Sequence, residues 1–217
     1  MSYSCHLPPS SQEFMDAPQS LLNPYCHGME EHPSAIAERA KVLAPSTSID
    51  SVLDPLSFHL SLGLAYTVGS AIGSRPPSTD SCLAAFVAPN RVGLTAGARA
   101  WSKHAHRSQS PDISPEDSKK QAESSAGWWG SPSGPVQSIN ERALALFWKV
   151  MNAATWRNLH WLPHQILVYE VRVAEGYGMR WSQDRSGAQS EDEMPEWVLR
   201  GFVEPMMEGG HEVGWRH

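Results

Sequence analysis

The chain has 217 residues, with 17 lysines and arginines against 23 aspartates and glutamates, for a formal net charge of −6. A chain of this length can bury the core of one domain and still carry an extension. Because nucleic-acid affinity comes largely from basic side chains that neutralise phosphates, this charge balance disfavours nucleic acid as a partner.

The first 90 residues form an acidic part of the chain. They hold three basic and eight acidic side chains, whereas residues 91–217 hold fourteen and fifteen. Residues 1–30 are rich in proline and serine and show no sustained period, which is typical of a disordered arm. A short helix is expected after Ser34, which can cap it. We therefore predict a partly disordered or helical N-terminal extension over residues 1–90.

The three cysteines lie in this same part of the chain. Cys5, Cys26 and Cys82 are odd in number and widely spaced, which indicates free thiols and neither a disulfide framework nor a zinc site. The opening sequence MSYSCHLPPSSQEF lacks the basic and apolar regions of a secretory signal. We expect a cytoplasmic protein.

Residues 55–74 contain no formal charge, and Gly69 and Gly73 have the spacing of a helix-packing GxxxG pattern. A membrane span is one interpretation of this segment. The same window contains several serines, a threonine, a histidine and a proline, and unbonded polar groups are costly in hydrocarbon. A semi-buried helix or irregular segment is favoured, without a membrane partner.

The domain expected over residues 91–217 contains all nine tryptophans and six of the ten histidines. Large aromatic side chains are typical of cores and interfaces. A helix is predicted to begin after Thr95, which can cap it, and to continue to His106. Residues 108–127 are polar throughout and predict a long mobile loop.

The clearest helix signal starts at Ser138. Glu141 follows three residues later, which is the spacing of a capping box. Apolar residues then recur at helical spacing as far as Ala154, so one face of the helix needs a partner surface. We expect this helix to end between Trp156 and His160 and to pack on the sheet that follows.

Two strands and the loop between them can be assigned a register. Apolar and polar residues alternate along ILVYEVRV and YGMRWS, which is the two-residue period of strands. A three-residue loop with Gly176 in the left-handed position pairs Val171 with Met179 and Glu170 with Arg180. A two-residue loop would place the apolar face opposite polar residues, so it is rejected.

A third strand, WVLRGFVE, follows an acidic loop. Simple alternation places Arg200 and Phe202 on one face and Leu199 and Gly201 on the other. The predicted fold is α+β, with a three-stranded antiparallel meander packed by helices on one face. The other face would carry Glu170, Arg172, Arg180 and Arg200.

This arginine-bearing face is the first candidate site. Arginines bind carboxylates and phosphates in a bidentate way, so Arg172, Arg180 and Arg200 could hold a small anion or a partner peptide. Trp181 and Trp215 are candidates to line the same surface. Charged residues are also ordinary on the solvent face of an antiparallel sheet, so this alternative stays open. The favoured function is the binding of a small anionic molecule or peptide, and no cofactor is assigned.

An enzyme is the second interpretation. Glu204, Glu208 and His211 lie close together in the sequence and could act as general acid and base, with an arginine stabilising negative charge. The reaction would be that of a lyase, an isomerase or a hydrolase acting on a small metabolite. The sequence contains no GxSxG nucleophile motif and no phosphate-binding loop.

Metal binding is the third interpretation. Two histidines and a carboxylate can form an open metal site. The spacings argue against such a site, because Pro163 interrupts the helix that would align His160 with His164. The sequence therefore assigns no metal ligand. The histidine pairs weighed here are His104 and His106, His160 and His164, and His211 and His217.

Several segments resemble an uncharacterised family of small soluble proteins that end in a similar glycine, glutamate, histidine and tryptophan tail. They are ARAWSKHAHRS, GWWG, YEVRVAEGYGMRWS, GFVEPMMEGGH and GWRH, and they lie between Leu94 and His217. The resemblance implies a self-contained domain and brings no known activity with it.

Overall fold

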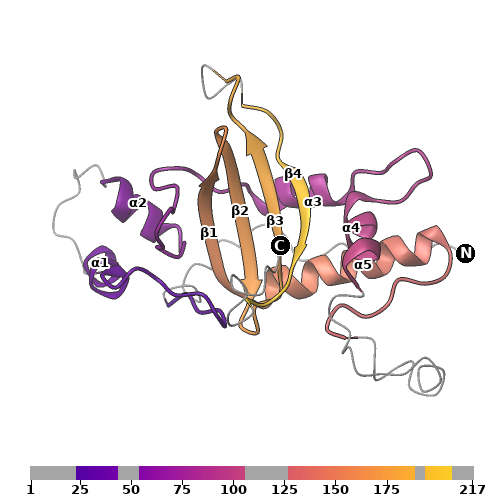
Figure 1. The fold of residues 1–217 in the computed structure, drawn as a ribbon, viewed down its shortest axis with the longest axis horizontal. Coiled ribbons are helices and arrows are strands. Elements are labelled where there is room, and N and C mark those ends of the chain that lie inside the picture. The colour runs from indigo at the N-terminus through magenta and orange to yellow at the C-terminus, as the bar shows by residue number, and fades with distance from the viewer. Residues whose placement is uncertain (1–22, 44–53, 106–126, 189–193, 207–217) are drawn as a thin grey trace, which may run out of the picture.

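The computed structural model describes residues 23–43, 54–105, 127–188 and 194–206. These residues contain a four-stranded antiparallel sheet in the order β1-β2-β3-β4, so each strand pairs with its neighbours in sequence (Figure 1). The α+β class is confirmed, whereas the prediction of three strands is wrong. The strands are β1 (Ala154–Leu162), β2 (Ile166–Val173), β3 (Gly178–Asp184) and β4 (Val198–Val203).

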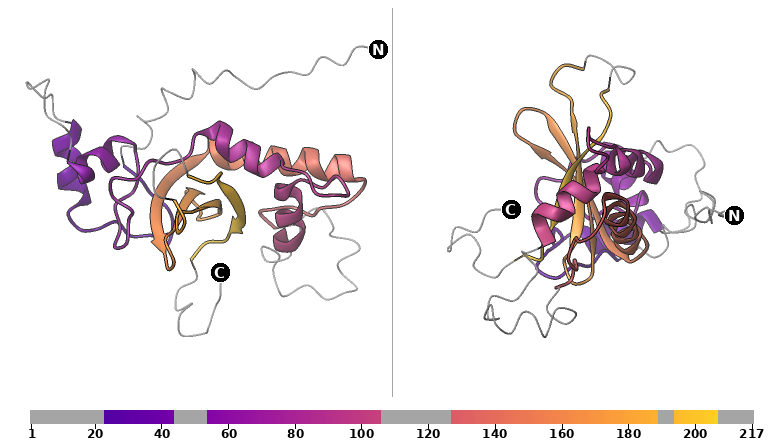
Figure 2. Two further views of the ribbon diagram at one scale, coloured as in Figure 1. Left: turned by 90° about the horizontal axis from the view of Figure 1, so that it is seen from above. Right: turned by 90° about the vertical axis from the view of Figure 1, so that its right-hand side faces the viewer.

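The helices lie in two groups on either side of the strands. One pair, α1 and α2, lies beyond β1 (Figures 1 and 2). In the other group, α3 and α4 contact β4, and α5 contacts β2. None of the helices in the described residues is long and apolar enough to cross a membrane. The helices are α1 (Ala35–Leu43), α2 (Pro55–Ser61), α3 (Thr79–Val87), α4 (Ala96–His104) and α5 (Val136–Asn152).

The fourth strand is β1, which the sequence analysis had assigned to the end of a helix. Helix α5 ends at Asn152, and β1 begins two residues later and pairs with β2. The segment ATWRNLHWL has a strand period, and pairing with β2 determines its conformation. The predicted capping box at Ser138 is also wrong, because α5 begins at Val136 without a side-chain cap.

The hairpin between β2 and β3 has the predicted register. Glu170 pairs with Arg180 and Val171 pairs with Met179. Gly176 has a φ of 101°, and a Cβ there would lie 2.9 Å from the Cα of Pro205. The turn therefore requires glycine both for its backbone conformation and for the close approach of another segment.

A β-bulge shifts the alternation of β4. The register between β3 and β4 is irregular after Arg180, which pairs with Gly201, while Trp181 pairs with Leu199. The bulge places Phe202 in the core beneath the helices, although simple alternation had assigned it to the same face as Arg200. One extra residue in a strand reverses the faces of the residues that follow.

The main core lies between the helices and one face of the sheet. Phe147 of α5 contacts both Phe86 of α3 and Trp181 of β3 there, and all three side chains are buried. The indole Nε1 of Trp181 donates to the carbonyl oxygen of Cys82 at 3.1 Å, so this tryptophan contributes a satisfied polar group to the core.

The outer edge of β1 is covered by residues from the N-terminal part of the chain. Ala65 and Ala71 donate backbone hydrogen bonds to Arg157 and Leu159, both at 2.7 Å. Tyr25 adds a third bond by donating to Thr155 at 3.0 Å. These bonds pair the exposed backbone of an edge strand and hold the segment around residues 65–71 beside the sheet.

The contact between Gly97 and Phe86 gives a stability prediction. A Cβ at Gly97 would overlap the ring of Phe86. Gly97→Ala should therefore lower the free energy of unfolding by about 1–3 kcal/mol, as overpacking does, although alanine is the better helix former. Urea unfolding followed by circular dichroism measures this difference.

Gly187→Ala is the matched control. Gly187 is exposed, and a Cβ there would meet nothing within 4 Å. The control should unfold like the wild type. A Gly97→Ala protein that is as stable as the wild type would contradict this packing of α3 on α4.

Candidate functional site

One face of the sheet packs on the core helices α3 and α5. The other face carries a connected set of polar side chains. The register places Asn158 of β1 opposite Glu170 of β2, and Glu170 opposite Arg180 of β3. His160 and Arg172 follow at the two-residue period on the same face. We call Asn158, His160, Glu170, Arg172 and Arg180 the polar face.

Glu170 connects two arginines at the centre of the polar face. Its carboxylate accepts hydrogen bonds from the Nε atoms of Arg172 and Arg180. The Glu170 and Arg172 side chains are 3% and 0% exposed, whereas Arg180 keeps 24%. Arg180 is therefore oriented by a buried carboxylate while part of its guanidinium remains accessible.

Burial alone would raise the pKa of Glu170, but its two arginine partners outweigh burial. Their positive charges and hydrogen bonds hold the pKa of the Glu170 carboxyl below its ordinary value of 4.5. Glu170 is therefore ionised at neutral pH. Arg172 also donates to the carbonyl oxygen of Glu204 at 2.8 Å, which ties the end of β4 to the same group.

His160 is half-buried on the polar face, and none of the described residues forms a hydrogen bond with its ring. Burial lowers the pKa of the His160 imidazole below its ordinary value of 6.5, and the carboxylate of Glu170 opposes this shift. The positive charges of three nearby arginines lower it further. His160 is thus neutral at pH 7 and can accept a proton.

His160 opens into a hollow of about 280 Å³, which we call the His160 hollow. Glu170, Arg180 and Asn158 also line it. A neutral imidazole here lies in the same hollow as a fixed guanidinium. Such a pair combines a proton acceptor with a group that binds negatively charged oxygen atoms.

A second hollow of about 320 Å³ adjoins the first and is lined by His104, Arg200 and Glu204. Arg180 lines both hollows. The Nδ1 atom of His104 lies 3.5 Å from a carboxylate oxygen of Glu204, and both side chains are largely buried. We call this second space the His104 hollow.

The His104 side chain lies against β4 beside Gly201. A Cβ at position 201 would lie 3.6 Å from Nε2 of His104. The same glycine pairs with Arg180 across the sheet. An imidazole from α4 therefore lies beside the strand position that pairs with Arg180.

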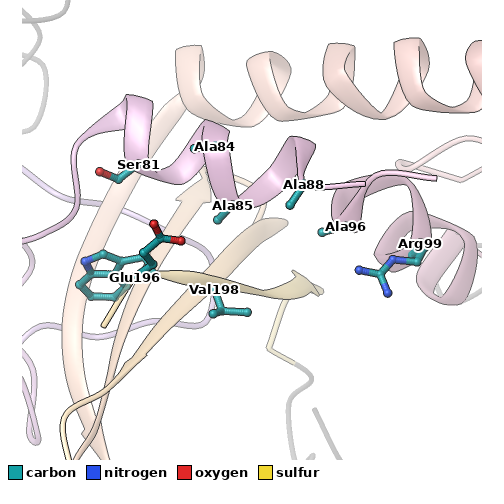
Figure 3. A pocket seen from close by; sticks show the side chains of 9 residues that line it. Ser81, Ala84, Ala85, Ala88, Ala96, Arg99, Glu196 and Val198 are labelled. Carbon is teal, nitrogen blue, oxygen red and sulfur yellow. The ribbon is translucent and has the colours of Figure 1, made fainter. Parts of the chain in front are cut away.

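A larger hollow of about 430 Å³ lies elsewhere, between α3 and β4 (Figure 3). Four alanines form much of its lining, and its charged residues, Glu196 and Arg99, lie at opposite ends. It contains no histidine. Acid–base chemistry is therefore better supported in the two hollows of the polar face.

The structure brings some of the predicted site residues together and separates others. Arg180, Arg200 and Glu204 line the His104 hollow. Arg172 lies beneath the surface, where its contacts hold neighbouring groups in place. Trp181 lies on the opposite face, in the core. The other predicted residues lie outside the described part of the chain, namely Glu208, His211 and Trp215.

Sequence analysis missed Asn158 altogether and weighed His104 and His160 only as metal ligands. Within the described residues, no three His, Cys, Asp or Glu side chains gather into a group that could hold a metal ion. The signal for His160 was its two-residue spacing from Asn158, which is the period of a strand. That signal was lost when β1 was assigned to a helix.

The chain is similar to one protein family over part of its length. Residues 116–188 match the model of the family described as CdiA C-terminal tRNase toxin domain. This stretch includes β1, β2 and β3, and with them the five residues of the polar face. No curated protein and no solved structure matches this chain.

The family match corrects two predictions. The match contradicts the prediction that this domain binds a small anion or a partner peptide. It also contradicts the prediction that nucleic acid is not a partner. The exclusion relied on the net charge of the whole chain. Net charge is an average, and it does not show that arginines gather on one face of the sheet.

The buried position of Glu170 gives a second stability prediction. Glu170→Gln leaves two arginines without their carboxylate, so it should lower the free energy of unfolding by about 3 kcal/mol. Because the pKa of Glu170 is lowered in the folded state, its stabilisation is present above the ordinary pKa of 4.5 and is lost as pH falls through the folded-state pKa. The variant should lose this part of the acid dependence, as measured by urea unfolding between pH 3 and 7.

Glu196→Gln provides the control, because Glu196 is an exposed carboxylate away from the polar face. It should change neither the stability nor its dependence on pH. If Glu170→Gln behaved in the same way as this control, the buried ion pairs of the polar face would be refuted.

Proposed function

We propose that this domain is a ribonuclease, with tRNA as its substrate class. The observation that carries the proposal is that a neutral His160 lies in one hollow with Arg180, on strands within the stretch matched by the tRNase family. A phosphodiester of RNA can react with its own 2′-hydroxyl group. The groups required are a base, an acid and a positive charge near the phosphate.

His160 is proposed as the general base. Its lowered pKa keeps the imidazole neutral at pH 7, so a ring nitrogen can take the proton from the 2′-hydroxyl. The new bond forms between this oxygen and phosphorus. A general base of this kind contributes roughly 10²–10⁴-fold to a rate.

Arg180 is proposed to bind the phosphate whose charge grows during the reaction. Glu170 holds its Nε, which leaves the outer guanidinium nitrogens to face the hollows. Arg200 lines the adjoining hollow and is exposed, so it can reach the same phosphate or its neighbour. Donors fixed before the reaction stabilise developing charge without reorganisation at the moment of reaction.

His104 is proposed as the general acid. A carboxylate oxygen of Glu204 lies 3.5 Å from its Nδ1, and a hydrogen bond formed between them in the complex with RNA would orient the imidazole for proton transfer. As the bond between phosphorus and the 5′ oxygen breaks, His104 gives its proton to that oxygen. The products are a 2′,3′-cyclic phosphate on one fragment and a 5′-hydroxyl on the other.

Replacement of the proposed base should remove cleavage without unfolding the protein. His160→Ala should cut purified tRNA at least about 100-fold more slowly than the wild type, because it lacks the group that takes the 2′-hydroxyl proton. Gel electrophoresis with end-labelled tRNA measures the rate. The cyclic phosphate appears as a 3′ end that cannot be extended until the ring has been hydrolysed and a phosphatase has removed the resulting monophosphate.

His164→Asn is the matched control. His164 lies in the turn between β1 and β2 with a φ of 64°, a conformation that asparagine adopts readily. This variant should cleave tRNA at the wild-type rate. The proposal fails if the wild-type protein cuts no RNA, or if His160→Ala cuts as fast as the control.

The pH dependence of cleavage should report the charge around His160. Because the base must be neutral, kcat/KM should fall on the acidic side at a pH below the ordinary imidazole value of 6.5. Removing a nearby positive charge favours the protonated ring, so Arg200→Gln should move this acidic limb to higher pH. Rates measured from pH 4.5 to 8 check the direction, and a limb that moves to lower pH would contradict it.

A further inference from the structure

The lining of the His160 hollow also includes apolar residues. Besides His160 and Arg180, the hollow is lined by Met29, Val68, Trp161 and Met206. Val68 is 92% exposed and Trp161 is 43% exposed. The described part of the chain therefore presents apolar side chains to solvent next to groups suited to a phosphate.

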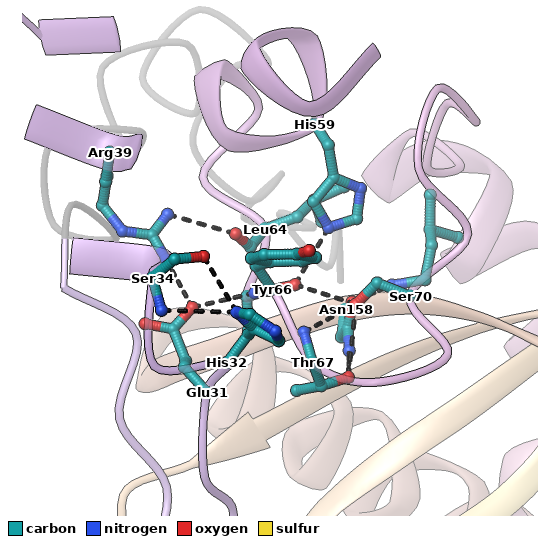
Figure 4. A network of polar contacts seen from close by, with 12 residues as sticks. Glu31, His32, Ser34, Arg39, His59, Leu64, Tyr66, Thr67, Ser70 and Asn158 are labelled. Carbon is teal, nitrogen blue, oxygen red and sulfur yellow. Dashed lines mark hydrogen bonds and ion pairs between the residues drawn. The ribbon is translucent and has the colours of Figure 1, made fainter. Parts of the chain in front are cut away.

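The turn that carries Val68 is fixed to the polar face. Asn158 donates to Oγ1 of Thr67 at 3.0 Å and accepts from Oγ of Ser70 at 3.1 Å (Figure 4). Within the turn, the backbone N–H of Thr67 donates to Oγ of Ser70 at 2.9 Å. One buried asparagine on β1 thus holds both ends of the turn that carries Val68.

A second anchor holds the chain just before this turn. The carboxylate of Glu31 accepts from the backbone N–H of Tyr66 at 2.8 Å and from the guanidinium of Arg39 (Figure 4). Arg39 also donates to the carbonyl oxygen of Leu64 at 3.2 Å. Hydrogen bonds therefore fix the turn that exposes Val68, and Val68 has a defined position in the lining of the hollow.

The hollow also has room beside this turn. A Cβ at Gly69 would meet no atom within 4 Å. The volume of about 280 Å³ is near the lower end of the roughly 300–1,000 Å³ typical of small-molecule sites. A space of this size is suited to a group such as a single nucleobase and is too small for a stacked helix.

We infer that the His160 hollow is a nucleobase subsite, in which Val68 and Trp161 contact an unstacked base next to the phosphate held by Arg180. Proteins that recognise single-stranded RNA place unstacked bases against aromatic and apolar side chains. The inference rests on the proposed function and narrows it to RNA loops, where a base can leave its stack. Val68 and its turn lie outside the stretch that the tRNase family matches.

The test uses RNA hairpins that cannot be cut because every loop nucleotide carries a 2′-O-methyl group. In a series of hairpins, one loop nucleotide at a time lacks its base. One abasic position should weaken binding to the wild-type protein by at least about fivefold, which is the loss expected when one stacked base is removed. Fluorescence anisotropy measures the dissociation constant of each hairpin.

Val68→Asp should weaken binding of the intact hairpin by a similar factor, because a carboxylate replaces the apolar contact. It should also bind the intact hairpin and the weakest abasic hairpin equally. Val92→Asp is the matched control, since Val92 is 68% exposed and does not line the hollow. The control should bind and discriminate like the wild type.

The inference is overturned if the wild type binds all the abasic hairpins as tightly as the intact one. It is also overturned if Val68→Asp cannot be told from Val92→Asp, or if no hairpin binds. Cleavage of unmodified tRNA is measured separately. RNA cleavage without base dependence would refute the subsite alone, whereas base-dependent binding without cleavage would refute the ribonuclease and retain the subsite.

Discussion

The buried carboxylate of Glu170 is the constraint on which the polar face depends. An ionised group whose side chain is only 3% exposed is tolerated only when opposite charges and hydrogen bonds compensate its lost hydration. Arg172 and Arg180 provide both. Arg172 links this carboxylate to the carbonyl oxygen of Glu204, just after β4. Arg180 links it to both hollows, because Arg180 lines each of them. The positions of Arg180 and of the residue after β4 therefore depend on one buried charge.

The parts of the fold that could be predicted from the sequence are those determined by local chemistry. The loop at Gly176 and the alternation on either side of it determine how Glu170 pairs with Arg180. The Thr95 cap of α4 was predictable for the same reason, because its hydroxyl accepts from an amide only three residues away. Strand β1 was not predictable in this way, since its conformation comes from pairing with β2. The β4 bulge likewise appears only when the strand is set against β3.

The candidate site likewise combines residues that the sequence predicts with residues that only tertiary packing brings together. Three residues proposed from the sequence, Arg180, Arg200 and Glu204, do lie around one hollow, because they belong to adjacent strands and to the end of one of them. His104 comes from a helix and Val68 from a turn beyond β1, so their approach depends on tertiary packing. The partner class was misjudged for a different reason. A formal charge of −6 describes the whole chain, whereas phosphate binding depends on the local field at one surface.

The bonds that close the edge of β1 join segments far apart in the sequence, and this separation affects how the molecule folds. Thr67 and Asn158 are 91 positions apart, and Tyr25 and Thr155 are 130 apart. Contacts across such long loops form slowly, because the entropy of loop closure must be lost before the bonds can form. Both hollows also need Arg180 of β3. A chain that has not yet reached β3 lacks Arg180 and therefore has neither hollow.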